Sequence, residues 1–288
     1  MLAAWSARKL LYIRPNTLSE AVNLLAASGG KILAGGTDVF PSLGDAPLTG
    51  TVVDISALRE LRGISKDNQY FRIGGLATWT DVIQTPLPPC FDALKSAARE
   101  IGGVQIQNRG TVAGNLCNAS PAADSVPPLL ALDAEVELVS QAGTRQLPLA
   151  DFIVGNRKTL RQPGEILSQV LVPRSIENAA STFLKLGTRD YLVISIAMVA
   201  VVLQKDRPGL ITDARVSVGS CSAVAKRLPE LERVLIGASA GPGLGMLVSD
   251  EHVEDLSPIT DVRAPDDYRR YAAQMLVHRA INTCVENL

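Results

Sequence analysis

The chain has 288 residues, 47% of them hydrophobic, and a formal net charge of −1 at pH 7. A chain of this length can bury a large core, and its length alone suggests two domains. The near-zero charge and the lack of a basic run argue against nucleic-acid binding, and the most apolar window, residues 194–203, is far shorter than the ~20 residues that cross a bilayer.

The first segment, residues 1–57, is predicted to alternate strands with one helix. Thr17 and Glu20 are spaced as a capping box, which predicts a helix start, and Gly29-Gly30 predicts where that helix ends. The strands are expected at residues 12–14, 31–34 and 51–55. The order strand, helix, strand predicts a small α/β unit.

The second segment, residues 58–174, is predicted to mix helices and strands. Pro127-Pro128 opens a short helix, because proline is tolerated in the first turn. The expected helices lie at residues 91–101 and 127–132, and the expected strands at 71–74, 135–139 and 166–172. We interpret the polar passage 174–180 that follows as an interdomain linker.

The last segment, residues 180–288, is predicted to form strands first and helices afterwards. The strands are expected at 181–186, 197–203 and 214–218, and the helices at 228–236 and 266–284. This order is typical of an α+β domain. The predicted fold class is therefore α+β, with subdomains at 1–57 and 58–174 and a C-terminal domain at 180–288.

Two glycine-containing stretches, Leu33–Asp38 and Thr111–Asn115, carry the strongest functional signal. Glycine lacks the Cβ that blocks close approach and permits positive φ, so consecutive backbone N–H groups can converge on a diphosphate. The hydroxyls of Thr37 and Thr111 add further donors. Because both stretches lie between predicted elements, they predict a bound dinucleotide.

Other functional motifs fit the chain less well. Neither stretch matches the dinucleotide-binding G-x-G-x-x-G pattern, and no phosphate-binding G-x-x-x-x-G-K-[ST] motif occurs. Residues 237–241 match the hydrolase pattern G-x-S-x-G around Ser239, with Asp250 and His252 downstream. That motif follows a predicted helix rather than a strand, so a hydrolase is the weaker alternative.

Side chains that could do chemistry of their own are scarce. The four cysteines occur singly, without C-x-x-C spacing, and the two histidines lack a partner at metal-ligand spacing. We predict no metal site and no catalytic residue. For Cys117, a buried side chain is the simpler interpretation and a redox role the alternative. An enzyme of this kind leaves its chemistry to a cofactor, and a flavin fits that requirement.

The run from Asn115 to Ala134 resembles the FAD-binding medium subunit of the molybdenum hydroxylases, the family of xanthine dehydrogenase and carbon monoxide dehydrogenase flavoproteins. The likeness extends from Arg14–Ala21 to Asp267–Arg270, which is nearly the whole chain. It implies a vanillyl-alcohol-oxidase-like FAD-binding fold of two α/β subdomains followed by a C-terminal α+β domain.

The resemblance also implies a set of FAD-binding residues. Asp124 would hold polar atoms on the adenosine side, Leu167 would pack against the adenine, and Lys185 would meet the isoalloxazine ring. Tyr191 either covers one ring face or is a domain-interface aromatic. The full set is Leu33, Ala34, Gly35, Gly36, Thr37, Asp38, Val39, Ile101, Thr111, Gly114, Asn115, Asn118, Asp124, Leu167, Lys185 and Tyr191.

One departure from the family pattern falls in the second glycine stretch. Ala113 stands where relatives have a second glycine in T-x-G-G-N. If that position requires positive φ, alanine costs about 1 kcal/mol and weakens FAD retention.

The implied function is electron transfer within a complex. Electrons would arrive from a small subunit with two-iron clusters, substrate oxidation would take place on a large molybdopterin subunit, and the acceptor would be NAD+, a quinone, a carrier or oxygen. We expect a dimer of heterotrimers. The alternative is a flavin-binding scaffold or sensor without redox turnover. No secretory signal is evident, so a cytoplasmic location is expected.

Overall fold

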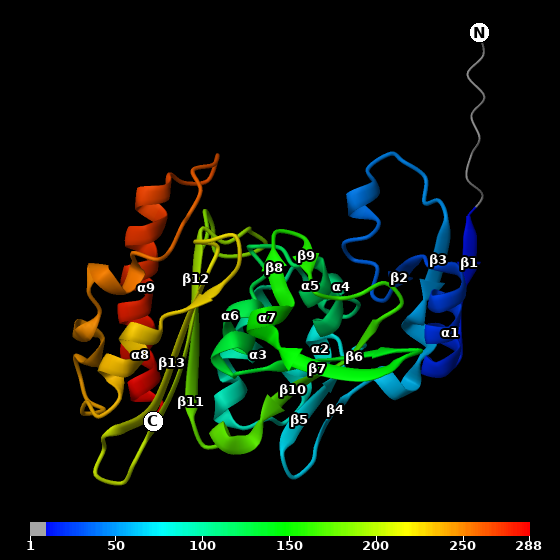
Figure 1. Ribbon diagram of the computed structural model, residues 1–288. Helices are drawn as coiled ribbons and strands as arrows, with labels where there is room; N and C mark the ends of the chain where they lie inside the picture. The colour runs from blue at the N-terminus through cyan, green and yellow to red at the C-terminus, as the bar shows by residue number, and fades with distance from the viewer. Residues whose placement is uncertain (1–9) are drawn as a thin grey trace.

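The computed structural model describes residues 10–288, which form three larger sheets in succession along the chain and one two-stranded hairpin. In Figure 1 the first sheet lies at the right, the second in the middle and the third at the left. The mixture of helices and strands confirms the α+β class. Within the described residues, no helix combines the length and the apolarity that a membrane crossing needs.

The first sheet is parallel, with strand order β1 (Leu11–Ile13), β3 (Thr51–Asp54), β2 (Lys31–Leu33). Helix α1 (Leu18–Ser28) connects β1 to β2. The Thr17 hydroxyl accepts the N–H of Glu20 at 3.2 Å, as the capping box predicts, but the Glu20 carboxylate accepts the N–H of Asn16 at 2.9 Å rather than that of Thr17. The predicted helix start is confirmed. The predicted hydrogen bond from the Thr17 N–H to Glu20 is wrong, because the N–H of Asn16 takes its place.

The second sheet is antiparallel, with strand order β4-β5-β10-β6-β7. Its strands are β4 (Ile64–Lys66), β5 (Tyr70–Gly74), β10 (Ile166–Pro173), β6 (Glu135–Ser140) and β7 (Gly143–Pro148). The helices of this segment are α2 (Trp79–Gln84), α3 (Asp92–Glu100), α4 (Val104–Gln107), α5 (Val112–Asn118), α6 (Val126–Ala131) and α7 (Leu149–Phe152). A hairpin of β8 (Ile153–Gly155) and β9 (Lys158–Thr159) follows α7.

The third sheet is antiparallel and lies between two helical layers. Its strands are β11 (Ala180–Leu186), β12 (Ala197–Lys205), β13 (Ile211–Gly219) and β14 (Lys226–Arg227). Helix α9 (Asp266–Glu286) packs on its outer face, together with α8 (Pro229–Leu235), while α3 and α6 cover its inner face (Figure 1).

Strand β12 belongs to two hydrophobic cores at once. Met198, Ala200 and Val202 are buried in the core of the middle segment, whereas the alternate residues Val199 and Val201 are buried in the core under α9. Successive side chains of a strand point to opposite faces, so both faces of β12 are covered. This explains why residues 197–203 read as a continuous apolar run.

The passage 174–180, which we predicted as an interdomain linker, connects β10 to β11 as a packed turn. Residues Arg174–Ile176 form a 3-10 turn, and Ile176 is only 1% exposed. Arg174 pairs with Glu177 at 2.7 Å and donates to the carbonyl of Asp67 at 2.8 Å. Two of the polar residues that suggested a linker, Arg174 and Glu177, therefore form an ion pair that stabilises this turn. The other short 3-10 helices are Pro41–Leu43, Ile55–Ala57, Arg59–Leu61, Pro89–Phe91, Leu244–Leu247 and Asp250–Val253.

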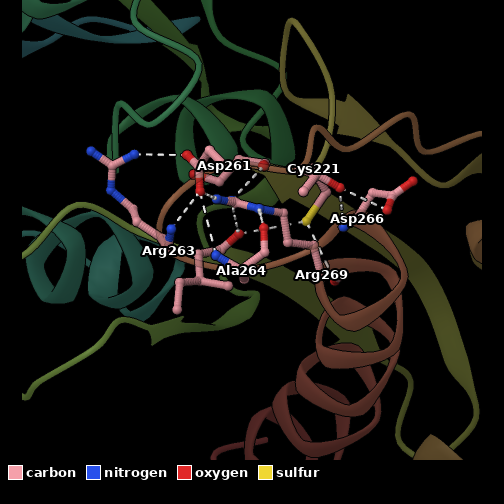
Figure 2. A network of polar contacts seen from close by, with 9 residues as sticks. Cys221, Asp261, Arg263, Ala264, Asp266 and Arg269 are labelled. Carbon is pink, nitrogen blue, oxygen red and sulfur yellow. Dashed lines mark hydrogen bonds and ion pairs between the residues drawn. The ribbon is translucent and has the colours of Figure 1, made fainter.

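A buried arginine ties the start of α9 to the third sheet (Figure 2). Arg269 is 3% exposed, donates to the carbonyl of Ile196 at 2.8 Å, and pairs with Asp261 at 2.7 Å. Asp261 also accepts the backbone N–H and the guanidinium of Arg263. The backbone N–H of Arg263, together with the guanidiniums of Arg269 and Arg263, lowers the pKa of Asp261 to about 2. The carboxylate is therefore charged at neutral pH and compensates the buried cation.

Candidate functional site

A cavity of about 620 Å³ lies where the first sheet meets the middle segment. Both predicted glycine stretches line it, together with residues from α2, α4, α5 and β10. Of the residues expected to bind a dinucleotide, the following line the cavity: Ala34, Gly35, Gly36, Thr37, Asp38, Val39, Ile101, Thr111, Gly114, Asn115, Asn118 and Leu167. The two stretches thus share one cavity, which was the structural condition for them to hold a single ligand.

The first stretch leaves β2 after Leu33 and continues as a turn that includes Val39. Gly36 has φ +75, a conformation that favours glycine. Gly35 is required for a different reason, because a Cβ there would overlap the backbone carbonyl of Arg109. Its bare Cα permits the close approach of the backbone that leads into the second stretch, whereas the sequence suggested that both glycines serve the ligand directly.

The backbone donors of the first stretch are free. Among residues 10–288, no backbone carbonyl or side chain accepts a hydrogen bond from the N–H groups of Gly36, Thr37, Asp38 or Val39. Four consecutive N–H groups at the wall of a cavity are a common arrangement for binding an anion.

The second stretch is the first turn of helix α5, not a glycine turn. Thr111 is its N-cap, and the Thr111 hydroxyl accepts the N–H of Gly114 at 3.0 Å. The N–H of Val112 donates to the carbonyl of Ala77, and that of Asn115 to the carbonyl of Thr111, each at 3.0 Å. Most donors of this stretch therefore already have acceptors within the protein.

The condition for strain at Ala113, a positive φ, is not met in the structure. Ala113 lies inside α5 and is not among the residues with positive φ. Alanine is the residue most favourable to a helix, so it carries no conformational penalty here. The family glycine at this position is not needed for the backbone geometry of this chain.

Asp124 and Lys185 bind each other outside the residues that line the cavity. Lys185 Nζ lies 2.7 Å from Asp124 Oδ2, and both side chains are 8% exposed. The Ser195 hydroxyl donates to the other carboxylate oxygen at 2.5 Å. Burial raises the pKa of Asp124, although the Lys185 charge and these hydrogen bonds lower it. The pair joins the loop after α5 to strand β11.

Leu33 and Tyr191 also lie outside the cavity lining. Leu33 is the last residue of β2 and is buried, whereas Tyr191 is 72% exposed after β11. Their contact with a cofactor, like that of Asp124 and Lys185, stays a prediction.

Sequence reasoning did not assign Lys31, Trp79 and Arg161 to the site. Lys31 and Arg161 bring positive charge to the lining, and Trp79 contributes apolar surface, as does Cys117. Burial raises the pKa of the Cys117 thiol to about 11, so it is protonated at neutral pH. This favours the interpretation of Cys117 as a packing residue.

The residues of the hydrolase alternative do not form a triad. Ser239 follows the end of α8 and forms an isolated bridge with Leu210. His252 Nδ1 accepts the N–H of Ser249 at 3.0 Å, and Asp250 accepts the side chain of Gln274. A nucleophile elbow needs a strand before the serine and a helix after it, and neither is present around residue 239.

Comparison with known proteins identifies the family. Residues 6–175 match the model described as "FAD binding domain in molybdopterin dehydrogenase", and residues 182–284 match "CO dehydrogenase flavoprotein C-terminal domain". This chain belongs to the FAD-binding subunits of the molybdopterin dehydrogenases. The resemblance seen in the sequence is thereby confirmed, and so is FAD as the cofactor of the family.

Individual relatives agree with this assignment over most of their length. The xanthine dehydrogenase FAD-binding subunit of Escherichia coli O157:H7 is 32% identical over 279 residues, covering 95% of each chain. The nicotinate dehydrogenase FAD-subunit of Eubacterium barkeri is 34% identical over 235 residues, covering 79% of each. Carbon monoxide dehydrogenase from Hydrogenophaga pseudoflava has a chain that superposes with a TM-score of 0.86 at 27% identity, covering 96% of this chain and 97% of that one.

Proposed function

We propose that the cavity holds FAD with its diphosphate on the first glycine stretch. The four free N–H groups of residues 36–39 carry this proposal, because these half-buried donors lie in the lining of the cavity and have no acceptor among the described residues. Arg161 and Lys31, in the same lining, supply positive charge for the diphosphate. The first turn of α5 forms part of the cavity wall but offers the diphosphate fewer free N–H groups, because three of them are already bonded within the protein.

The apolar part of the lining suits the flat rings of a dinucleotide. Ile101, Ile166 and Leu167 line the cavity, and Leu167 is the residue expected beside the adenine. Asn118 places an amide on the same wall. We further propose that Asp124, Lys185 and Tyr191 meet the cofactor in the assembled protein. We also propose that residues 1–174 form a vanillyl-alcohol-oxidase-like FAD-binding fold.

The chain acts as an oxidoreductase subunit through its cofactor. Bound FAD supplies the capacity to accept electrons singly and to release them in pairs. The protein residues would hold, orient and shield it, and within residues 10–288 no group of three His, Cys, Asp or Glu side chains could hold a metal ion. A non-catalytic scaffold is not favoured, since the relatives are named as dehydrogenase subunits.

We propose that electrons reach this subunit from a small iron–sulfur subunit with two-iron clusters, paired with a large molybdopterin subunit. The acceptor is NAD+, a quinone, a carrier or oxygen. The names of the relatives, which call them FAD subunits, support a multi-subunit complex. The dimer of heterotrimers and the cytoplasmic location stay predictions.

The test is to purify the chain with its co-expressed partners and to identify any extracted flavin by chromatography. We expect one FAD per chain, and reduction of that FAD when the complex receives its substrate. A preparation without flavin would contradict the proposed site. A flavin that stays oxidised in an active complex would instead support the scaffold alternative.

A further inference from the structure

Arg157 bridges the two walls of the cofactor cavity from outside. It occupies the turn of the β8–β9 hairpin with φ +54, and its backbone N–H donates to the carbonyl of Ala119 at 2.9 Å. Its Nη1 lies 3.1 Å from Asp38 Oδ2 and 2.7 Å from Asn118 Oδ1. Asp38 belongs to the first glycine stretch and Asn118 to α5, and both line the cavity. One guanidinium therefore connects the two segments that enclose the site.

The charge of Asp38 creates a need for this contact. Asp38 is the single acidic residue among the described residues that line the cavity, and it lies within the run of free N–H groups. Two like charges a few ångströms apart repel each other, and because the Asp38 side chain is 47% exposed, solvent screens part of this repulsion. An uncompensated carboxylate there would oppose a diphosphate on the same turn.

We propose that Arg157 is a positioning residue that neutralises Asp38, holds the first glycine stretch against α5, and thereby sets how long FAD is retained. This inference rests on the proposed FAD site. Arg157 is not among the lining residues, and its Nη1 is shared by Asp38 and Asn118. It therefore acts through those two side chains rather than by touching the diphosphate.

The experiment measures FAD release from the full chain with Arg157→Gln, Asp38→Asn and the double variant. Free FAD is more fluorescent than bound FAD, so release after dilution is followed directly and does not depend on turnover. Arg207→Gln is the matched control, because Arg207 is an exposed arginine in the turn between β12 and β13. Arg157→Lys tests whether the positive charge alone suffices.

We expect Arg157→Gln to release FAD about fivefold faster, the equivalent of one partly exposed charge contact. Asp38→Asn removes the negative charge from the cavity lining and should slow FAD release, and the double variant should recover most of the loss seen in Arg157→Gln. Adding salt should narrow the difference between Arg157→Gln and the parent. Arg207→Gln should release FAD at the parent rate.

Two results would overturn the inference. If Arg157→Gln releases FAD at the parent rate while its melting temperature is unchanged, the bridge has no role in retention. If Asp38→Asn fails to rescue Arg157→Gln, Arg157 does not act by neutralising the Asp38 carboxylate. FAD binding by the parent chain is measured before any variant is made. If the parent chain binds no FAD at all, the proposed FAD site itself is wrong.

Discussion

The two glycine-containing stretches share a cavity and a similar composition, yet their backbones do different things. Residues 36–39 form a turn whose N–H groups have no acceptor among the described residues, whereas three N–H groups at the start of α5 are already bonded within the protein. The first stretch is organised to receive a ligand. The second is organised to hold the first in place.

The role of each glycine follows from this difference. Position 35 requires glycine because the backbone of Arg109 lies against its Cα. Position 36 favours glycine because its φ is positive. Gly114 lies in an ordinary helical turn, where a Cβ would meet only the Thr111 hydroxyl, at 2.8 Å. A glycine in a cofactor-binding motif can therefore serve chain packing, backbone conformation or neither.

The largest effect is expected from Gly35→Ala, which should break the contact between the two stretches. Its Cβ would overlap a backbone carbonyl that cannot move aside, so we expect a loss of about 3 kcal/mol in the free energy of unfolding, with weakened FAD binding. Denaturant unfolding and FAD titration measure both. Gly114→Ala is the matched variant and should stay within about 1 kcal/mol of the parent, because helix propensity offsets a disturbed cap. Equal losses in the two variants would contradict the comparison.

Asp261→Asn tests whether a region far from both stretches affects stability alone. The variant leaves the buried Arg269 without its carboxylate, and we expect a loss of about 2 kcal/mol at neutral pH with unchanged FAD release.

The pH dependence of that loss has a definite sign. The pKa of Asp261 is lowered from 3.8 to about 2 in the folded protein, so its stabilisation is present above pH 3.8 and is lost as the pH falls toward 2. Asp261→Asn should lack this part of the acid transition, which denaturant melts between these pH values measure. A variant that loses stability with the parent's full acid slope would exclude the assignment.

Thr111→Val should give a smaller effect, confined to the helix. Removing the hydroxyl leaves the N–H of Gly114 without its acceptor and costs about 1 kcal/mol, a typical value for an N-cap. FAD release should change little, because the free donors lie in the other stretch. Thermal unfolding and FAD fluorescence measure the two effects. Much faster FAD release without a loss of thermal stability would show that the Thr111 hydroxyl contacts the cofactor rather than capping the helix.

The smallest effect is expected from Ala113→Gly, which restores the family glycine. Since Ala113 is helical, glycine should lower the unfolding free energy by about 0.5 kcal/mol and should not improve FAD retention. The measurement is a denaturant melt of both proteins beside FAD release. Tighter FAD binding in the glycine variant would mean that the helix start rearranges when the cofactor binds.

Long elements with clear boundary signals could be predicted from the sequence. The cap at Thr17 and the stop at Gly29 delimit α1, and the apolar run of β12 and the long α9 were found close to their true ends. Helix α5 was missed because a seven-residue segment containing glycine and two asparagines has low helix propensity. Tertiary contacts, such as the bond from Val112 to Ala77, hold it in place.

The site was predictable where the signal was local. Both glycine stretches were found because each is continuous in sequence, although the reason for Gly35 lay in a contact with Arg109 more than seventy positions away. Arg157 and Arg161 carried no signal, since isolated arginines after a strand are common. The sequence does not link Asp124 to Lys185, because the two residues are 61 positions apart and pair only across the fold.

The double burial of β12 makes the two family units mutually dependent. A fragment ending at residue 175 would lose the sheet face that covers its core, and a fragment beginning at 182 would leave Met198, Ala200 and Val202 in water. Exposed apolar rows of this kind promote aggregation. Neither half is therefore expected to be produced separately as a well-behaved protein, and the intact chain should melt in a single cooperative transition in calorimetry.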